Sequence, residues 1–226
     1  EPVQGEGGFY AASPQFMKQL RSICDRHGIV LIADEIQSGF CRTGKTFAIE
    51  HSEIEPDLIT MAKSLAGGFP LSALVGKKSL FDKALPGGLG GTYAGSPVAI
   101  AAALAVTDII EKEQLNARAQ AIGEQIKTRL HQLAEQFDCI GDVRGYGAMI
   151  AMELVEGRDS HRPDKELTAA LVQEAGRQGL ILLSCGVRGN VIRFLVPLTA
   201  EKEIINEGLN ILSSSLEVVQ NTRLTK

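Results

Sequence analysis

Two apolar runs of strand length, residues 28–33 and 58–62, each end in charged residues. Asp34 follows the first run, and Lys63 follows the second and opens into a glycine-containing turn. A helical pattern with Ser13 as its N-cap precedes the first run and ends at Gly28. Helices that alternate with fully apolar strands are typical of buried, mostly parallel sheets. We therefore expect an α/β fold that brings Asp34 and Lys63 to one edge of a sheet.

Asp34 and Lys63 have the chemistry that pyridoxal phosphate requires. A lysine where a buried strand ends suits covalent catalysis, because desolvation lowers the pKa of an amine and makes it nucleophilic. Pyridoxal phosphate needs such a lysine for a Schiff base and an acid that faces its pyridinium nitrogen. The alternative is that each residue is simply solvated or caps a helix, as most charged residues at strand ends do.

Two further features suit anionic groups. Arg193 lies in an otherwise apolar strand, so its guanidinium needs either an acidic partner in a structural ion pair or an anionic ligand such as a substrate carboxylate. The loop at residues 86–95 contains five glycines. Its backbone amides and the Thr92 hydroxyl could hold a phosphate, or the loop could be only a connector.

Composition limits the kinds of partner. The net charge is −4 and basic residues are scattered, which argues against a nucleic-acid or anionic-membrane surface. No apolar stretch is long enough to span a membrane, and no export signal opens the chain. Cysteine spacing indicates reduced thiols, with neither a disulfide framework nor a metal site; these residues are Cys24, Cys41, Cys139 and Cys185. We expect a cytoplasmic protein whose partners are small molecules or proteins.

After Pro97 the sequence changes character. A long helical stretch that continues to about Phe137 is interpreted as a bridge between domains. Beyond it, apolar runs alternate with helical patterns, which predicts a small α+β domain. The runs are residues 148–154, 180–183 and 191–196, and the helical patterns are residues 165–178 and a last one from about Ala200.

Taken together, the motifs of this chain resemble those of one family, the class III, fold-type I pyridoxal-phosphate aminotransferases. The segments that carry the resemblance are residues 1–8, Asp34-Glu35-Ile36-Gln37-Ser38-Gly39 with Arg42-Thr43-Gly44, Ala62-Lys63-Ser64 with Gly67-Gly68, and Gly90-Gly91-Thr92-Tyr93. The resemblance extends through essentially the whole chain. It implies that residues 1–110 are the C-terminal portion of the mostly parallel large domain that binds the cofactor. Residues 111–226 would be a linker helix and the small C-terminal domain.

The resemblance implies a role for each matching residue. Lys63 would hold pyridoxal phosphate as a Schiff base and, once released, shuttle the proton between the substrate carbon and the cofactor. Asp34 would keep the pyridinium nitrogen protonated. Ile36 would pack on the ring face, and Gln37 would hydrogen-bond near the phenolic oxygen of the ring. Thr92 would reach the cofactor phosphate of a neighbouring subunit, which implies a homodimer or a dimer of dimers.

The resemblance also suggests the substrates, a small-molecule amine and a 2-oxo acid. Within the family, three segments look most like bacterial members that transfer the amino group of 4-aminobutyrate to 2-oxoglutarate, giving succinate semialdehyde and glutamate. Arg193 would bind the α-carboxylate of glutamate, Glu6 would neutralise Arg193 when that carboxylate is absent, and Glu1 would line the same pocket. Other amines, such as 5-aminovalerate or ornithine, and a non-catalytic assembly module are the alternatives. The three segments are residues 86–95, 179–186 and 193–198.

The length of the chain departs from the family pattern. Family members carry a further segment of similar length ahead of the region that matches Glu1, and this chain begins without Met in a glycine-rich turn. We interpret it as the C-terminal part of a longer enzyme. On this interpretation the isolated chain is inactive or nearly so, because the other part would hold the cofactor phosphate and cover one face of the ring.

Overall fold

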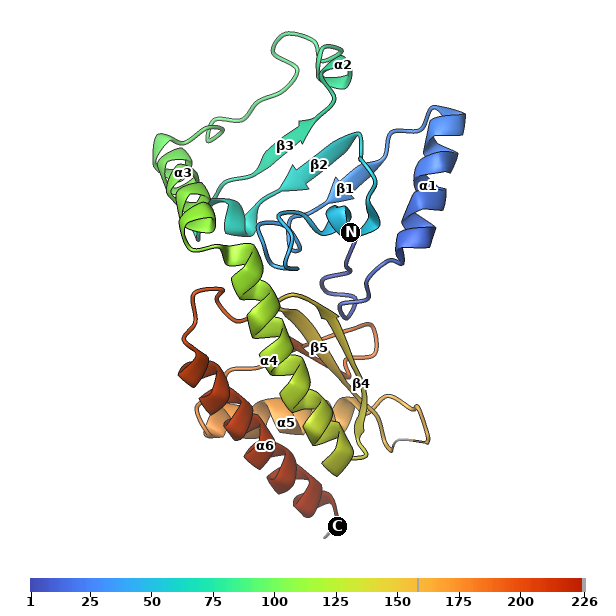
Figure 1. The fold of residues 1–226 in the computed structure, drawn as a ribbon, viewed down its shortest axis with the longest axis vertical. Coiled ribbons are helices and arrows are strands. Elements are labelled where there is room, and N and C mark those ends of the chain that lie inside the picture. Colours follow the sequence, from blue (N-terminus) through green and yellow to red (C-terminus); the bar gives the residue numbers. More distant parts are fainter. Residues whose placement is uncertain (158, 225–226) are drawn as a thin grey trace. The chain divides into compact units, whose positions relative to one another are not determined.

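The computed structural model describes residues 1–157 and 159–224, and the chain divides into two compact units (Figure 1). The first unit comprises Glu1–Val3 and Ala11–Ala117, and the second comprises Gln4–Tyr10 and Arg118–Lys226. A short segment near the N-terminus therefore folds with the second unit. The assignment of a cofactor-binding role to residues 1–110, and of a linker and small domain to residues 111–226, stays a prediction.

The first unit is a three-stranded sheet with helices beside it (Figure 1). Its helix α1 begins and ends as predicted, because Ser13 Oγ accepts the Phe16 N–H and Gly28 has a φ of 63°, which glycine adopts without strain. Met17 of α1 packs in a small core with Ala33 and Ile49. The elements are α1 (Pro14–His27), β1 (Ile32–Asp34), the 3-10 helix η1 (Ala48–Ser52), β2 (Leu58–Met61), the 3-10 helix η2 (Lys63–Ala66), β3 (Ala73–Gly76), α2 (Lys78–Phe81) and α3 (Pro97–Lys112).

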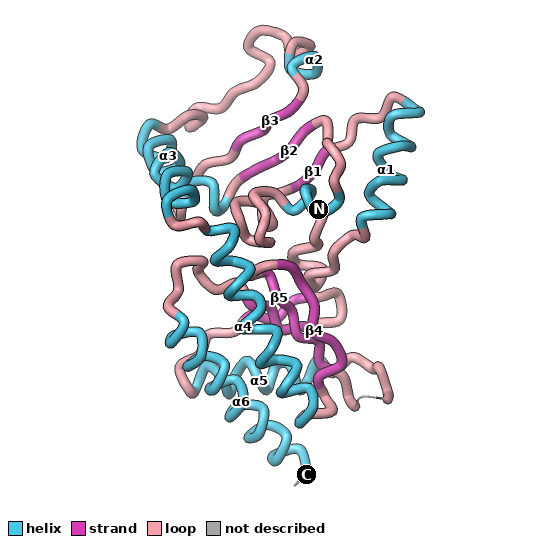
Figure 2. Tube along the Cα trace, viewed as in Figure 1, coloured by secondary structure: helices cyan, strands magenta, loops and turns pink. Residues whose placement is uncertain are grey.

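This sheet, whose strands are magenta in Figure 2, is mixed, whereas the sequence predicted a mostly parallel one. β1 pairs with β2 in parallel, with Asp34 opposite Thr60, but β2 pairs with β3 in the antiparallel direction. The connection from β2 to β3 holds only η2 and a glycine turn. A parallel return needs a crossover of about a dozen residues or more, usually with an α-helix. The α/β class is therefore right and the strand direction of β3 differs.

Asp57 ties together the strands of the first unit just ahead of β2. Its carboxylate accepts hydrogen bonds from the Leu31 N–H at 2.7 Å, from the Arg21 guanidinium at 2.8 Å and from the Lys77 ammonium at 2.6 Å. Its backbone N–H donates to the Leu31 carbonyl, and its own carbonyl accepts the Lys77 N–H. The donors to the carboxylate, with the Leu31 N–H first, hold the pKa of Asp57 well below its usual range.

We expect Asp57→Asn to lower the free energy of unfolding by about 2–3 kcal/mol at pH 7, because an amide leaves Arg21 and Lys77 without this carboxylate. Since the folded-state pKa of Asp57 is depressed, its contribution is complete above the unfolded-state pKa of about 4, declines below that value and is lost only as the pH falls through the folded-state pKa. Urea denaturation at pH 7 and pH 3 measures both quantities. Asp25→Asn, which removes an exposed partner of Arg21, is the control and should cost less than about 1 kcal/mol. A difference between wild type and Asp57→Asn that is as large at pH 3 as at pH 7 would contradict the role of the carboxylate.

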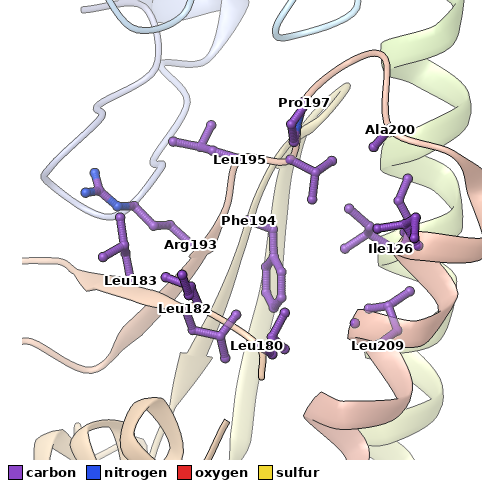
Figure 3. Close-up of a pocket in the computed structure, with 15 residues that line it drawn as sticks. Ile126, Leu180, Leu182, Leu183, Arg193, Phe194, Leu195, Pro197, Ala200 and Leu209 are labelled. Carbon is purple, nitrogen blue, oxygen red and sulfur yellow. The ribbon is translucent and has the colours of Figure 1, made fainter. Parts of the chain in front are cut away.

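The second unit is a four-stranded antiparallel sheet in the order β4-β5-β7-β6, an α+β arrangement. Helices α4, α5 and α6 lie over the face to which Phe194 contributes its side chain (Figures 1 and 3). The core between them is made of fully buried aliphatic side chains, including Leu130, Met152 and Leu212. The elements are α4 (Leu115–Gln136), β4 (Ile140–Tyr146), β5 (Met149–Leu154), α5 (Lys165–Arg177), β6 (Leu183–Cys185), β7 (Val191–Phe194) and α6 (Lys202–Leu224).

Two elements differ from the sequence prediction. The single helix expected up to about Phe137 is broken into α3 and α4 at Gln114, which has a left-handed φ of 53°. The Gln114 side-chain amide donates to the Glu111 carbonyl and satisfies one of the last carbonyls of α3. The strand expected at residues 180–183 begins only at Leu183, because the Leu180 N–H still donates to the Ala175 carbonyl at the end of α5.

The four cysteines are buried and carry free thiols. Within residues 1–157 and 159–224, no group of three or more His, Cys, Asp or Glu side chains is placed to hold a metal ion. The helices in that same part of the chain are too short or too polar to cross a membrane.

Candidate active site

Asp34 and Lys63 lie at the carboxyl ends of two neighbouring parallel strands. Asp34 is the last residue of β1 and is paired with Thr60 of β2, while Lys63 is the first residue of η2, shortly after β2 ends at Met61. The Glu35 N–H donates to the Thr60 carbonyl at 3.0 Å and extends the pairing by one residue. Parallel strands bring their carboxyl ends to one edge of a sheet, where ligands of α/β proteins bind. The register therefore places a carboxylate and an amine at the same edge.

The backbone of Lys63 is in an unfavourable conformation. Its φ is 46°, in the left-handed region, which costs about 1–2 kcal/mol for a residue with a Cβ. Such backbone strain is concentrated at functional sites. The Lys63 side chain is exposed, so the described residues do not bury its amine, in contrast to the desolvated lysine expected from the sequence.

Glu35 holds the turn that follows Asp34, a role that the sequence did not reveal. Its side chain is 0% exposed, and its carboxylate accepts hydrogen bonds from the Ser38 hydroxyl at 2.5 Å, the Ala48 N–H at 3.0 Å and the Ile49 N–H at 2.7 Å. Burial raises the pKa of Glu35, and the three donors oppose that rise. One buried carboxylate thus connects the start and the end of the loop between β1 and η1.

Ile36 and Gln37 lie in the turn that Glu35 holds. The Ile36 N–H donates to Asp34 Oδ1 at 3.0 Å, which orients the Asp34 carboxylate. Gln37 Oε1 is buried and has no hydrogen-bond partner among the described residues. A buried polar atom without a partner costs about 1–3 kcal/mol, so such an atom in a native structure needs an explanation, and a ligand is one.

Glu1 and Thr92 are exposed residues of the first unit. All residues of the loop at 86–95 are exposed, and Tyr93 beside Thr92 is 93% exposed. The structure does not test the phosphate contact expected of Thr92 or the substrate contact expected of Glu1. Both stay predictions.

The second unit brings Glu6 and Arg193 together. They are 187 positions apart, and Arg193 Nη1 forms an ion pair with Glu6 Oε1. The Glu6 side chain is 72% exposed, whereas that of Arg193 is 16% exposed. Arg193 Nε is buried and has no partner among the described residues, so the guanidinium keeps a donor available beside its ion pair. Of the two possibilities that the sequence left open for Arg193, the structure contains the ion pair with an acid.

An apolar cavity of about 330 Å³ lies beside the same strand but on its other face. It is lined by Ile126 of α4, Phe194 of β7 and Leu209 of α6, among others (Figure 3). The guanidinium of Arg193, the one charged residue in its lining, points away from Phe194 in Figure 3. The cavity therefore offers a place for apolar groups and no groups for acid–base chemistry.

We expect Glu35→Gln to lower the free energy of unfolding by about 2–3 kcal/mol. The carboxylate accepts hydrogen bonds from backbone N–H groups, and the amide nitrogen of glutamine cannot accept them. Glu50→Gln is the matched control, since Glu50 accepts the Phe47 N–H at 2.7 Å at an exposed site. It should cost about 0.5 kcal/mol. Urea denaturation of both variants measures the difference, and losses of equal size would mean that the buried carboxylate does not hold the turn.

A family model and the curated relatives of this chain point to the same family of proteins. The model of the family "aminotransferase class-III" matches residues 1–216. The chain is 55% identical over 217 residues to 4-aminobutyrate aminotransferase GabT of Escherichia coli, and 54% identical over 217 residues to 5-aminovalerate aminotransferase DavT of Pseudomonas aeruginosa. Each match covers 96% of this chain and 51% of the relative. The chain thus spans about half the length of these curated relatives.

A solved structure shares the fold. The crystal structure of a transaminase from the marine bacterium Virgibacillus superposes on this chain with a TM-score of 0.92 at 29% sequence identity. The superposition covers 98% of this chain and 52% of that one. The mixed sheet with the antiparallel β3 and the four-stranded antiparallel sheet are therefore features that this chain has in common with half of a transaminase.

Proposed function

Because this chain belongs to the class III aminotransferases, we propose that the whole protein transfers the amino group of 4-aminobutyrate to 2-oxoglutarate, giving succinate semialdehyde and glutamate. The observation that carries the proposal is the position of Asp34 and Lys63 at the carboxyl ends of the parallel strands β1 and β2. Class III aminotransferases use pyridoxal phosphate, and we propose the same cofactor here.

The residues at this edge of the sheet fit pyridoxal phosphate. When bound, the cofactor supplies an electron sink for the substrate carbon that bears the amine. Lys63 offers the amine that would hold it, and Asp34 offers a carboxylate for its ring nitrogen. Gln37 offers a buried amide whose oxygen has no partner among the described residues, and Ile36 is the adjacent apolar residue for the ring face.

Two of these residues handle protons. The Lys63 amine would act as a general base that takes the proton from the substrate carbon and delivers it to the cofactor. The Asp34 carboxylate, oriented by the Ile36 N–H, favours a proton on the ring nitrogen because opposite charges within hydrogen-bond distance stabilise each other.

Glu6 and Arg193 suit a site that must accept two different substrates. Glutamate carries a carboxylate next to its amine, whereas 4-aminobutyrate does not. Arg193 would bind that carboxylate bidentately once Glu6 moves away, and Glu6 would neutralise Arg193 when 4-aminobutyrate is bound. The exposure of the Glu6 side chain supports this proposal, because an exposed side chain can move without disturbing a core. Glu1 would line the same pocket.

We also propose that the whole protein is a homodimer or a dimer of dimers. The exposed glycine-rich loop at residues 86–95 supports the proposal, since its backbone amides and the Thr92 hydroxyl are accessible to a neighbouring subunit. Thr92 would there reach the cofactor phosphate of that subunit.

A second candidate substrate is 5-aminovalerate, which is longer than 4-aminobutyrate by one methylene. The observation in its favour is the identity to DavT, which is within one percentage point of the identity to GabT. The test is kcat/KM of the whole protein for 4-aminobutyrate, 5-aminovalerate and ornithine, each with 2-oxoglutarate. A higher value for 5-aminovalerate would select the second candidate, and no transfer from any of the three amines would reject the proposed function.

We expect borohydride reduction of the whole protein with pyridoxal phosphate to label Lys63, as mapped by peptide mass spectrometry. Lys63→Ala should remove the label and lower kcat by about a thousandfold or more, since the covalent attachment and the general base are lost together. Lys78→Ala is the control, because Lys78 is an exposed lysine whose ammonium pairs with the nearby Asp82. A label spread over several lysines would contradict the assignment of Lys63.

We expect Glu6→Ala to lower the rate of the 4-aminobutyrate half-reaction about tenfold more than that of the glutamate half-reaction. Only 4-aminobutyrate leaves the charge of Arg193 uncompensated when Glu6 is absent. Single-turnover measurements of the two half-reactions give the ratio, with Glu203→Ala on the exposed start of α6 as the control. Equal losses in both half-reactions would refute the exchange of partners at Arg193.

A further inference from the structure

Two arginines lie in one row across the sheet of the second unit. Arg144 of β4 is paired with Ala151 of β5, and Ala151 is paired with Arg193 of β7. Paired residues of antiparallel strands direct their side chains to the same face, so both arginines flank the small Ala151 on one face. The next pair, Ile150 and Phe194, belongs to the opposite face, which the helices cover. The two arginines therefore share the other face of the sheet.

The segment Gln4–Tyr10 lies over this row, and each arginine holds a different part of it. Arg193 pairs with the Glu6 carboxylate, whereas Nε and Nη2 of Arg144 donate to the Gly8 carbonyl at 3.0 and 2.8 Å. The backbone of Glu6 is also held, because the Gly186 N–H, just after β6, donates to the Glu6 carbonyl at 2.9 Å. The backbone is thus fixed at Glu6 and two residues beyond it, while the Glu6 side chain stays exposed.

Gly8 allows the close approach of Arg144. Its φ of 115° is one that residues with a Cβ rarely adopt, and a Cβ there would lie 3.1 Å from the Tyr10 ring and 3.4 Å from Arg144 Nη2. The contact between guanidinium and carbonyl thus depends on a glycine at this position.

Arg144 is itself held in a fixed orientation. Its Nη1 donates to Glu153 Oε2 and to Asp142 Oδ2, both at 2.7 Å. Its guanidinium lies over the Tyr10 ring, 3.9 Å from the centroid, and the Tyr10 hydroxyl donates to Glu153 Oε2 at 2.8 Å. The side chain is 14% exposed. A satisfied network of this kind keeps its members in one arrangement.

We propose that Arg144 is a positioning residue that fixes the segment Gln4–Tyr10 and so keeps Glu6 within reach of Arg193. This inference rests on the proposed function, in which Glu6 neutralises Arg193 for one substrate and leaves it for the other. An ion pair with one exposed partner contributes little free energy, because holding the two side chains together costs entropy. This entropy cost is larger when the backbone of the exposed partner is also free to move. By holding the Gly8 carbonyl, Arg144 reduces the entropy cost of each return of Glu6 to Arg193.

The role of Arg144 differs between the two half-reactions. Glutamate brings its own carboxylate to Arg193 and does not need Glu6 there. 4-Aminobutyrate brings no such group, so its half-reaction depends on the return of Glu6. A loss of the Arg144 contact should therefore act mainly on the 4-aminobutyrate half-reaction, which a general loss of stability would not do.

The test compares Arg144→Met and Arg144→Lys with wild type in the whole protein. Arg144→Met should lower the 4-aminobutyrate half-reaction about tenfold more than the glutamate half-reaction, and Arg144→Lys, which keeps the charge and a donor, should recover part of that loss. Hydrogen–deuterium exchange of the peptide covering residues 4–10 should be faster in Arg144→Met. The control is Arg223→Met, because the partner of Arg223 is the buried Asp164, which is the N-cap of α5. It should leave the ratio of the half-reactions and the exchange of residues 4–10 unchanged.

The outcomes separate the two proposals. Equal losses in both half-reactions, or faster exchange without a change in their ratio, would overturn the role of Arg144 in substrate choice. Exchange that is unchanged in Arg144→Met would overturn its role in fixing the segment. A wild-type protein that converts neither substrate would reject the proposed function, and the exchange measurement would then still decide whether Arg144 fixes the segment.

Discussion

The hydrogen bonds of Asp57 are the constraint on which the first unit depends. The side chain and backbone of Asp57 form hydrogen bonds with Leu31, just before β1, and with Lys77, just after β3. The guanidinium of Arg21 in α1 binds the same carboxylate. The strands are only three or four residues long, so their own ladders contribute few hydrogen bonds. Fixing one end of such short strands also fixes the other end. The positions of Asp34 and Lys63 thus follow from an acid at the far end of the strands, which takes no part in the proposed chemistry.

Charged residues that hold the backbone recur in both units. Glu35 is buried and accepts hydrogen bonds from groups at both ends of a loop. Arg144 donates hydrogen bonds to the carbonyl of Gly8, which is far from it in the sequence. Each has the charge and the burial by which catalytic groups are often recognised. Their partners are backbone groups and fixed side chains, so their charge is used to hold a loop in place. Lys63, which is expected to react, and Glu6, which is expected to move, are instead exposed.

The sequence was sufficient for the features that depend on local pattern. Ser13 and Gly28 mark the two ends of α1 because capping is a local interaction. The apolar runs before Asp34 and Lys63 indicate the strands, and the motif around Lys63 indicates the family. The direction of β3 differs from the prediction because a fully apolar run is compatible with both parallel and antiparallel pairing. Only the short connection from β2 to β3 distinguishes the two.

Other features could not be read from the sequence because they depend on distant residues. The break at Gln114 has no glycine or proline to mark it, and the late start of β6 follows from a hydrogen bond of Leu180 with α5. Glu35 stands next to Asp34 and could not be separated from it by pattern alone. Arg144 contacts Gly8 and Tyr10, which lie more than 130 positions before it in the sequence.

The segment Gln4–Tyr10 has a consequence for how the chain folds during synthesis. Its contacts join residues that are 136 positions apart at Arg144 and 187 positions apart at Arg193. Forming these contacts therefore closes very long loops of the chain. Closing such loops carries an entropy cost that slows folding, and the contact of Glu6 with Arg193 cannot form until the ribosome has released β7. A nascent chain therefore carries Glu6 without its partner until the 187 positions to Arg193 have been synthesised. The device proposed to choose between substrates would be among the last parts to form, and a chain that terminates before β7 could contain Lys63 and Asp34 in a folded sheet and still lack the means of discrimination.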